Sequence, residues 1–435
     1  MFNEAIPVTL DGGFECQLPL MSQVNQHFSR NKITDINKTI RTQLDAREGS
    51  DNLAGKKLAI TVGSRGISGL IPVLEETIAY LHRHGAEPFI VPSMGSHGGA
   101  TSEGQIKILA GYGITEQSLG VPIRSSMDVV EVAKMPDGIP LYLDRIALEA
   151  DGIILCNKIK PHADFKGNVE SGLLKMLCIG LGNHLGASSL HRYGFHNFHT
   201  AIPEAGKRLL DKIMVTFAIG LIENAYDELM DIEVVEQAGI LKAEPNYLEK
   251  AKNNIASILF PEIDVLIIQE IGKNISGEGM DPNVTGRPGS GLKQGFNGPD
   301  IRSTVVLELS SSTHGNGVGI GMADITTRSL VNSLDLSAMY TNAATAGTLA
   351  TAKIPMVMDN DREAIIFALK TAPIHNIEKA KVMWIKNTLE LDYIMISAAL
   401  VESVEAIERA NLTGISMPFK FDSQGKLISW SSQQS

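Results

Sequence analysis

Residues 56–99 read KKLAITVGSRGISGLIPVLEETIAYLHRHGAEPFIVPSMGSHGG and contain the pattern that decides the fold. An apolar run from Leu58 to Val62 leads into a Gly/Ser turn. The apolar residues that follow recur at helical spacing, at Leu70, Val73, Leu74, Thr77, Ile78 and Leu81. Gly85 predicts the end of this helix, and a second apolar run, Pro88 to Pro92, leads into the turn GSHGG. The order strand, helix, strand predicts a βαβ unit with parallel strands.

The same alternation of apolar strands and amphipathic helices continues along the 435 residues. We therefore expect an α/β protein of two domains, with largely parallel sheets flanked by helices. A large domain is expected at residues 1–262 and a smaller α/β domain at 263–435. The smaller domain would begin with a strand and a glycine-rich loop at 272–300, and its final residues would pack back on the first domain. The expected ligand site is the cleft between the two domains.

Two helix starts are predicted from local signals. Pro203 is expected to open a helix over residues 203–213, because proline is tolerated in the first turn of a helix. Ser102 and Gln105 have the spacing of a capping box at the start of the helix after GSHGG.

Composition narrows the functional classes. The formal net charge of −11 argues against a nucleic-acid partner, which needs a basic face. The apolar runs are too short to cross a bilayer, and the first residues do not have the pattern of a secretory signal. Three scattered cysteines, Cys16, Cys156 and Cys178, indicate no disulfide framework. We therefore expect a cytoplasmic protein without a membrane partner.

Reactive side chains follow the predicted strands. In parallel α/β sheets ligands bind beyond the carboxyl ends of the strands, so these positions are candidates for a site. Arg65, beside Ser64, precedes a helix and could bind an anion, although an ordinary surface arginine is an equal alternative. His97 in GSHGG and His162 after Pro161 are candidate general acids or bases. Two such histidines could face each other across one substrate.

The segment KPHADFKGNVESGLLKMLCIGLGNHLGASSLH, residues 160–191, carries Lys175 and His191 sixteen positions apart. A continuous helix would separate these two residues by about 24 Å. Glycines at 180, 182 and 186 break helices, so the chain can reverse and return His191 towards Lys175.

Other interpretations of this segment remain open. The glycines form GxGxxxG, a weak match to a dinucleotide loop, because the preceding residues favour a helix over a strand. Histidines at 184, 191, 196 and 199 could indicate a zinc-dependent hydrolase or lyase, although their spacing is not a standard zinc pattern. A non-catalytic protein that binds small anions is the third alternative.

Taken together, the ordered motifs resemble the nickel-dependent lactate racemase family. The matching motifs are SR at 64–65, GSHGG at 95–99, PH at 161–162 and SGLLK at 171–175, followed by His191. The resemblance covers the large N-terminal domain best and continues more loosely into the second domain.

This resemblance implies a nickel-pincer nucleotide, a pyridinium mononucleotide that holds nickel and is tethered through a thioamide to a lysine. That lysine corresponds to Lys175, and His191 corresponds to the histidine that completes the nickel coordination. Ser64 and Arg65 would lie near the cofactor, with Arg65 beside its phosphate or the substrate carboxylate. Enzymes that synthesise the cofactor would be partners.

The implied activity is that of a racemase or epimerase, an isomerase that inverts the hydroxyl-bearing carbon of a 2-hydroxy acid by hydride transfer to and from the cofactor. His97 and His162 correspond to the acid/base pair of the family. Gln269 and Lys273 approximate its substrate-binding residues, and the charged residues of the 272–300 loop favour an acid larger and more polar than lactate. The expected substrate is a small anion, and the oligomeric state is not predicted.

Overall fold

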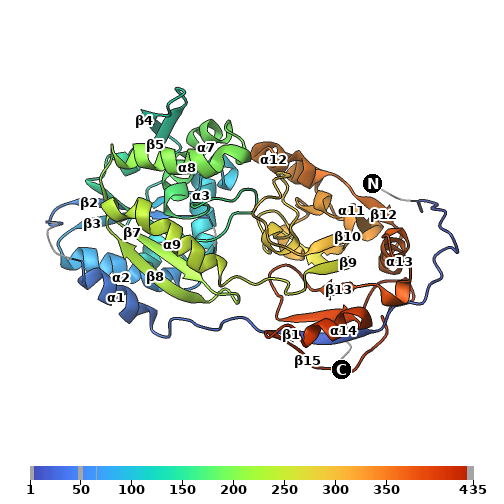
Figure 1. Ribbon diagram of the computed structural model, residues 1–435. Coiled ribbons are helices and arrows are strands. Elements are labelled where there is room, and N and C mark those ends of the chain that lie inside the picture. The colour runs from blue at the N-terminus through green and yellow to red at the C-terminus, as the bar shows by residue number, and fades with distance from the viewer. Residues whose placement is uncertain (1–3, 48–51, 65, 429–435) are drawn as a thin grey trace. The chain divides into compact units, whose positions relative to one another are not determined.

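The computed structural model describes residues 4–47, 52–64 and 66–428 (Figure 1). The chain divides into two compact units, one comprising Ser29–Ile255 and the other comprising Met1–Phe28 together with Ala256–Ser435. Both units are α/β, with sheets that are largely parallel and flanked by helices, as the sequence predicts. Among the described helices, none is both long and apolar enough to cross a bilayer.

The N-terminal residues differ from the predicted division at 262 and 263. Strand β1 (Met21–Gln26) pairs antiparallel with β14 (Tyr393–Ser397), with Met21 opposite Ser397. Its other edge pairs with β15 (Ala410–Leu412). The first strand therefore belongs to the unit formed by the C-terminal half. The described part of the C-terminal tail contributes β15 to this same unit, and residues 429–435 lie outside the described part.

The Ser29–Ile255 unit is built on a five-stranded sheet. Its strand order is β3-β2-β6-β7-β8, in which only β8 runs antiparallel to its neighbour. The strands are β2 (Lys57–Val62), β3 (Glu87–Pro92), β6 (Gly152–Lys158), β7 (Val215–Glu223) and β8 (Leu229–Val235). A separate two-stranded hairpin joins β4 (Val129–Lys134) to β5 (Pro140–Asp144).

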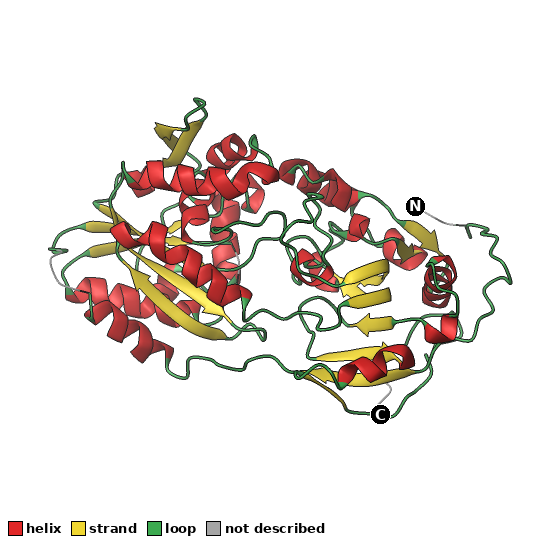
Figure 2. Cartoon of the chain, viewed as in Figure 1, coloured by secondary structure: helices red, strands yellow, loops and turns green. Residues whose placement is uncertain are grey.

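Helices cover both faces of this sheet (Figure 2). Alternate residues of one strand point to opposite faces, so Ala59 packs in one core while Leu58 and Ile60 pack in the other. One face carries α1 (Ile36–Asp45), α2 (Leu70–Arg83), α3 (Ser102–Gly111) and α4 (Glu116–Leu119). The other carries α6 (Leu173–Lys175), α7 (Asn183–His191), α8 (Phe195–Leu210) and α9 (Ile240–Lys252). The short helix α5 comprises Arg145–Leu148.

The βαβ prediction for residues 56–99 is confirmed. Helix α2 joins the parallel strands β2 and β3 and buries the residues predicted for its apolar face. Gly85 has a φ of 74°, and its N–H donates to the carbonyl of His82 (3.0 Å). This left-handed backbone conformation ends α2, as expected for glycine after a helix.

The predicted helix start at Pro203 and the predicted capping box are wrong, although α3 does begin at Ser102. Helix α8 begins at Phe195, and Pro203 lies inside it, eight residues after the start. The side chain that caps α3 is that of Thr101, which accepts the N–H of Gly104 (3.1 Å). Gln105 instead donates to the carbonyl of Gly95 (3.1 Å), so a tertiary contact replaces the capping box.

The second unit is built on an eight-stranded sheet of order β12-β11-β10-β9-β13-β14-β1-β15. The five strands from β12 to β13 are parallel, and the remaining three pair antiparallel. The new strands are β9 (Glu262–Ile271), β10 (Asp300–Leu309), β11 (Ile325–Thr327), β12 (Met356–Met358) and β13 (Val382–Ile385). Its helices are α10 (Pro282–Thr285), α11 (Arg328–Asn332), α12 (Leu336–Ala346), α13 (Asp361–Thr371) and α14 (Ala398–Val404).

Candidate functional site

Two of the predicted site residues meet at the carboxyl ends of β2 and β3. The two strands are neighbours in the sheet, so the turns that follow them lie side by side. Nδ1 of His97 is hydrogen-bonded to Oγ of Ser64. The Tyr112 hydroxyl donates to the backbone carbonyl of Ser64 (3.0 Å) and holds that turn on α3. Arg65, also assigned to this site, lies outside the described residues.

Glycine is required in the turn that carries His97. Gly98 has a φ of 68°, and a Cβ at this position would lie 2.5 Å from the backbone carbon of Gly104. A Cβ on Gly104 would in turn lie 1.8 Å from the carbonyl oxygen of Gly98. The two backbones therefore touch directly, which leaves the exposed imidazole of His97 standing on the first turn of α3.

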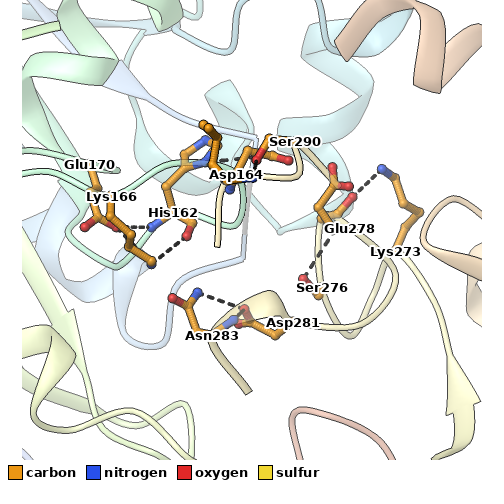
Figure 3. A network of polar contacts seen from close by, with 12 residues as sticks. His162, Asp164, Lys166, Glu170, Lys273, Ser276, Glu278, Asp281, Asn283 and Ser290 are labelled. Atoms are coloured by element: carbon orange, nitrogen blue, oxygen red, sulfur yellow. Dashed lines mark hydrogen bonds and ion pairs between the residues drawn. The ribbon is translucent and has the colours of Figure 1, made fainter. Parts of the chain in front are cut away.

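His162 lies on a loop whose ends are paired. Lys160 and Ser171 exchange backbone hydrogen bonds (2.9 and 3.2 Å) and close the loop between them. Inside it, the buried carboxylate of Glu170 accepts the backbone N–H groups of His162 (2.6 Å) and Gly167 (3.2 Å). The ammonium groups of Lys166 and Lys252 also bond to this carboxylate, at 3.3 and 2.8 Å. Figure 3 shows Glu170 with Lys166 and the backbone of His162.

The imidazole of His162 is held as a neutral ring. The backbone N–H of Asp164 donates to its Nδ1 (2.9 Å), so the proton of the neutral ring lies on Nε2. Burial, followed by the positive charges of Lys175, Lys166 and Lys160, lowers the pKa of His162 well below its ordinary value. At neutral pH this side chain is therefore a neutral donor through Nε2.

Lys175 ends α6 and is followed by one turn of π-helix, Met176–Gly180. The N–H of Leu181 closes this turn on the carbonyl of Met176 (2.9 Å). Asn183 then has a φ of 49°, and α7 begins in a new direction. π-Helical turns are rare and are frequently found at functional sites. The predicted chain reversal is present, although a π-turn and a left-handed asparagine produce it together with the glycines.

The reversal brings His191 close to Lys175. Burial and the positive charge of Lys175 lower the pKa of His191 to about 4, so its imidazole is neutral at pH 7. His162 senses the same lysine, and the ring of Phe195 lies between the two histidines, 5.8 Å from His162 and 5.7 Å from His191. The two neutral imidazoles therefore share one aromatic neighbour and one positive charge, that of Lys175.

The turn that carries His97 contacts the segment that carries Lys175. The N–H of Gly95 donates to the carbonyl of Gly180 (3.0 Å). A Cβ on Gly180 would lie 2.7 Å from the carbonyl oxygen of Ser93, so only glycine permits this approach. The predicted acid/base turn and the predicted tether thus belong to one continuous structure in the Ser29–Ile255 unit.

The alternative motifs in this segment have other structural explanations. In GxGxxxG, Gly180 ends the π-helical turn, Gly182 precedes α7 and Gly186 lies inside α7, whereas a dinucleotide loop follows a strand. Among the described residues, no three histidine, cysteine or acidic side chains are grouped so that they could hold a metal ion.

In the second unit, the two residues assigned to substrate binding have different partners. The amide of Gln269 donates to Glu308 (3.1 Å) and accepts from the indole of Trp384 (3.1 Å). The ammonium of Lys273 donates to the carbonyl of Gly277 (2.5 Å). The role of these two side chains in substrate binding stays a prediction.

The glycine-rich segment at 272–300 is ordered and lines a pocket of about 520 Å³. Two of its charged side chains hold the loop itself. Asp281 caps α10 by accepting the N–H of Asn283 (2.8 Å). Arg287 pairs with Asp324 (2.6 Å) and donates to the carbonyl of Ile301 (2.9 Å). The predicted binding loop is therefore in large part a self-supporting structure, with Lys293 on the pocket wall.

Two buried carboxyl groups next to the site were not predicted from the sequence. Glu170 organises the loop of His162, and Glu244 of α9 accepts the N–H of Leu174 (3.0 Å), next to Lys175. Glu244 is 69 residues from Lys175 in the chain, so no local spacing could reveal the contact. The signal available in the sequence was a glutamate at a helical position where an apolar residue is expected. A charge buried at such a position needs a partner.

One known protein domain matches part of the chain. Residues 27–196 match the model of the lactate racemase N-terminal domain. This segment of the chain is similar to that domain. The matched segment contains Ser64, His97, His162, Lys175 and His191, and it ends before Glu244.

No curated protein matches the chain by sequence. Two solved structures are similar to this chain. A protein from Thermotoga maritima is 13% identical, with a TM-score of 0.49 over 88% of this chain and 92% of its own. The lactate racemase apoprotein from Thermoanaerobacterium thermosaccharolyticum is 14% identical, with a TM-score of 0.49 over 85% of this chain and 99% of its own.

Proposed function

We propose that the protein is a racemase or epimerase that inverts the hydroxyl-bearing carbon of a 2-hydroxy acid, with a nickel-pincer nucleotide attached to Lys175. The observation that carries this proposal is the grouping of Lys175 with His162 and His191, whose rings both lie near Phe195. The match of residues 27–196 to a lactate racemase domain supports the class of reaction, an isomerisation of a hydroxy acid.

The side chains fit the proposed cofactor by their chemistry. A neutral imidazole is a suitable nickel ligand, and the pKa of about 4 keeps His191 neutral at physiological pH. Lys175 is half-buried and ends a helix that both neighbouring segments support. When bound, the cofactor would supply the acceptor and the donor of hydride for the substrate carbon.

The two remaining histidines would handle protons. His162 holds its proton on Nε2, because Nδ1 already accepts from Asp164, so it would donate a proton or hydrogen bond to the substrate oxygen. His97 is more exposed, and its Nδ1 is bonded to a hydroxyl that can either donate or accept. His97 is therefore the better initial proton acceptor. Arg65 and Lys273 remain the candidates for the substrate carboxylate.

The cofactor is tested by producing the protein together with the pincer-synthesis enzymes and measuring intact mass and bound nickel. We expect a mass increase on the peptide that contains Lys175, and none in Lys175→Arg. Lys212→Arg, at an exposed position in the same unit, is the matched control and should still carry the adduct. Loaded wild-type protein with an unmodified Lys175 would contradict the proposal.

The reaction is tested by following inversion of lactate and of larger 2-hydroxy and sugar acids with the loaded protein. Removal of an acid/base histidine usually lowers the rate by about 10²- to 10⁴-fold, so His97→Ala and His162→Ala should each do so while keeping the adduct. His191→Ala should lose nickel instead. A protein that binds these acids, is stabilised by them and inverts none of them would be a binding protein.

A further inference from the structure

Helix α9 places one carboxyl group directly against the turn that carries Lys175. Glu244 is 1% exposed, and its Oε2 accepts the N–H of Leu174 (3.0 Å). The N–H of Leu173 bonds to the same carboxyl group. These donors are the first N–H groups of α6, which no helical carbonyl can satisfy. Glu244 therefore caps the helix in place of a local side chain, since Gly172 at the N-cap has none.

The same turn is held from its other side by the sheet. The amide of Asn157, near the end of β6, donates to the carbonyl of Gly172 (2.9 Å). A Cβ on Gly172 would lie 2.1 Å from Oε1 of Glu244, although the φ of 173° at this position would suit any residue. The glycine is therefore required by the close approach of the carboxyl group.

This arrangement is not the one that stability alone would favour. Within the described residues, Oε1 of Glu244 is buried and has no hydrogen-bond partner. A carboxyl group that is buried and only half satisfied costs free energy, and an apolar side chain of similar volume would avoid the cost. The carboxyl group does, however, fix the position of the two residues before Lys175.

We propose that Glu244 is a positioning residue, which orients Lys175 for attachment of the cofactor by accepting the N–H groups of Leu173 and Leu174. The inference rests on the proposed function, in which Lys175 is the tether. Groups that orient a ligand from the second layer typically change affinity or activity by 10- to 100-fold when they are removed.

The test compares Glu244→Met, which removes the acceptor, with Glu244→Gln, which keeps one acceptor oxygen. Asp361→Asn is the matched control, because Asp361 is also a buried carboxyl group that accepts a backbone N–H, from Leu427 (2.8 Å), in the other unit. In the cofactor-free protein, the rate at which an acetylating reagent labels Lys175 is measured by peptide mass spectrometry, relative to Lys212. The occupancy of the Lys175 adduct is then measured after coproduction with the synthesis enzymes.

We expect Glu244→Met to change the labelling rate of Lys175 and lower adduct occupancy by about tenfold. Glu244→Gln should restore both, and Asp361→Asn should leave both unchanged. If Glu244→Met does not fold, Gly172→Ala replaces it, because its Cβ displaces the same carboxyl group. Unchanged labelling and occupancy in a folded Glu244→Met or Gly172→Ala protein would overturn the proposal. If wild-type protein acquires no adduct but labelling still follows Glu244, the proposed function fails and the positioning role stands.

Discussion

At the scale of single residues, the site depends on which groups are kept neutral. Burial and nearby lysines keep His162 and His191 uncharged, and burial raises the pKa of the Glu244 carboxyl group to about 7. Neutral imidazoles can bind a metal or donate a single proton, whereas imidazolium ions cannot bind a metal at all. The chemistry of the site therefore follows from desolvation together with the positive charges of nearby lysines, of which Lys175 acts on both histidines.

The first residue-scale prediction concerns the tautomer of His162. Because the N–H of Asp164 occupies Nδ1, the ring should be the neutral Nε2–H tautomer, and it should stay neutral well below the ordinary pKa of histidine. Nitrogen-15 NMR of histidine-labelled protein, with His162→Gln to assign the signal, measures both properties. An Nδ1–H tautomer, or protonation near pH 6.5, would contradict the assignment.

The second concerns the pH dependence of stability at Glu244. Its pKa rises from 4.5 to about 7, so between these pH values the unfolded state has lost a proton that the folded state keeps. The free energy of unfolding should therefore fall as pH rises from 4.5 to 7, by about 3 kcal/mol from this group. Glu244→Gln should remove that fall.

Urea unfolding at pH 5 and pH 8 gives the change in the free energy of unfolding between the two pH values. This change is compared between the variant and wild type. Glu249→Gln, at an exposed position on the same helix, is the control for the change of charge. Equal pH dependence in Glu244→Gln and wild type would show that the carboxyl group is ionised in the folded protein.

At the scale of elements, the site is assembled by close backbone contacts between turns. The turn after β3 donates from Gly95 to the end of the π-helical turn at Gly180, and α9 supports the start of the same segment. Strand ends and helix starts alone would leave these turns free to move. Glycines at the contact points let the backbones meet, so His97 and Lys175 have a fixed relation.

The element-scale prediction is that Gly180→Ala separates these two turns. Its Cβ would lie 2.7 Å from the carbonyl oxygen of Ser93, and overpacking of this kind typically costs about 1–3 kcal/mol. Gly111→Ala in α3 is the matched control, since its Cβ would meet no atom within 4 Å and should be neutral or stabilising. Thermal unfolding measures the cost, and equal melting temperatures for the two variants would contradict the contact.

At the scale of the whole molecule, the first strand of the chain completes the sheet of the last half. Strand β1 lies between β14 and β15 and pairs with both. The Ser29–Ile255 unit is therefore inserted, in sequence, within the other unit. Any fragment that begins after Phe28 lacks an interior strand of the eight-stranded sheet.

The whole-molecule prediction is that deletion of residues 1–28 destabilises one unit selectively. Backbone amides of β14 that pair with β1 should lose protection from hydrogen exchange, whereas those of β2 and β6 should keep theirs. Hydrogen exchange is measured by mass spectrometry on peptides that contain β14 and on peptides that contain β2 and β6, with wild-type protein as the reference. Equal loss of protection in both units would contradict independent cores.

Sequence reasoning reached the elements that depend on local periodicity. The βαβ unit at 56–99, the end of α2 at Gly85 and the return of His191 to Lys175 were predicted correctly. The start of α8 was missed, because burial of the helix face outweighs the one hydrogen bond that Pro203 removes. Glu244 was missed because its partner is 70 residues away in the chain.

The sequence by itself determined the α/β class and the order of most elements, because hydrophobic period and turn residues are local properties. Only the tertiary structure decided that β1 joins the C-terminal half, that His162 and His191 are neutral, and that Glu244 supports Lys175. Strand pairing, desolvation and buried hydrogen bonds arise between residues distant in sequence, so their outcome depends on how the whole unit packs.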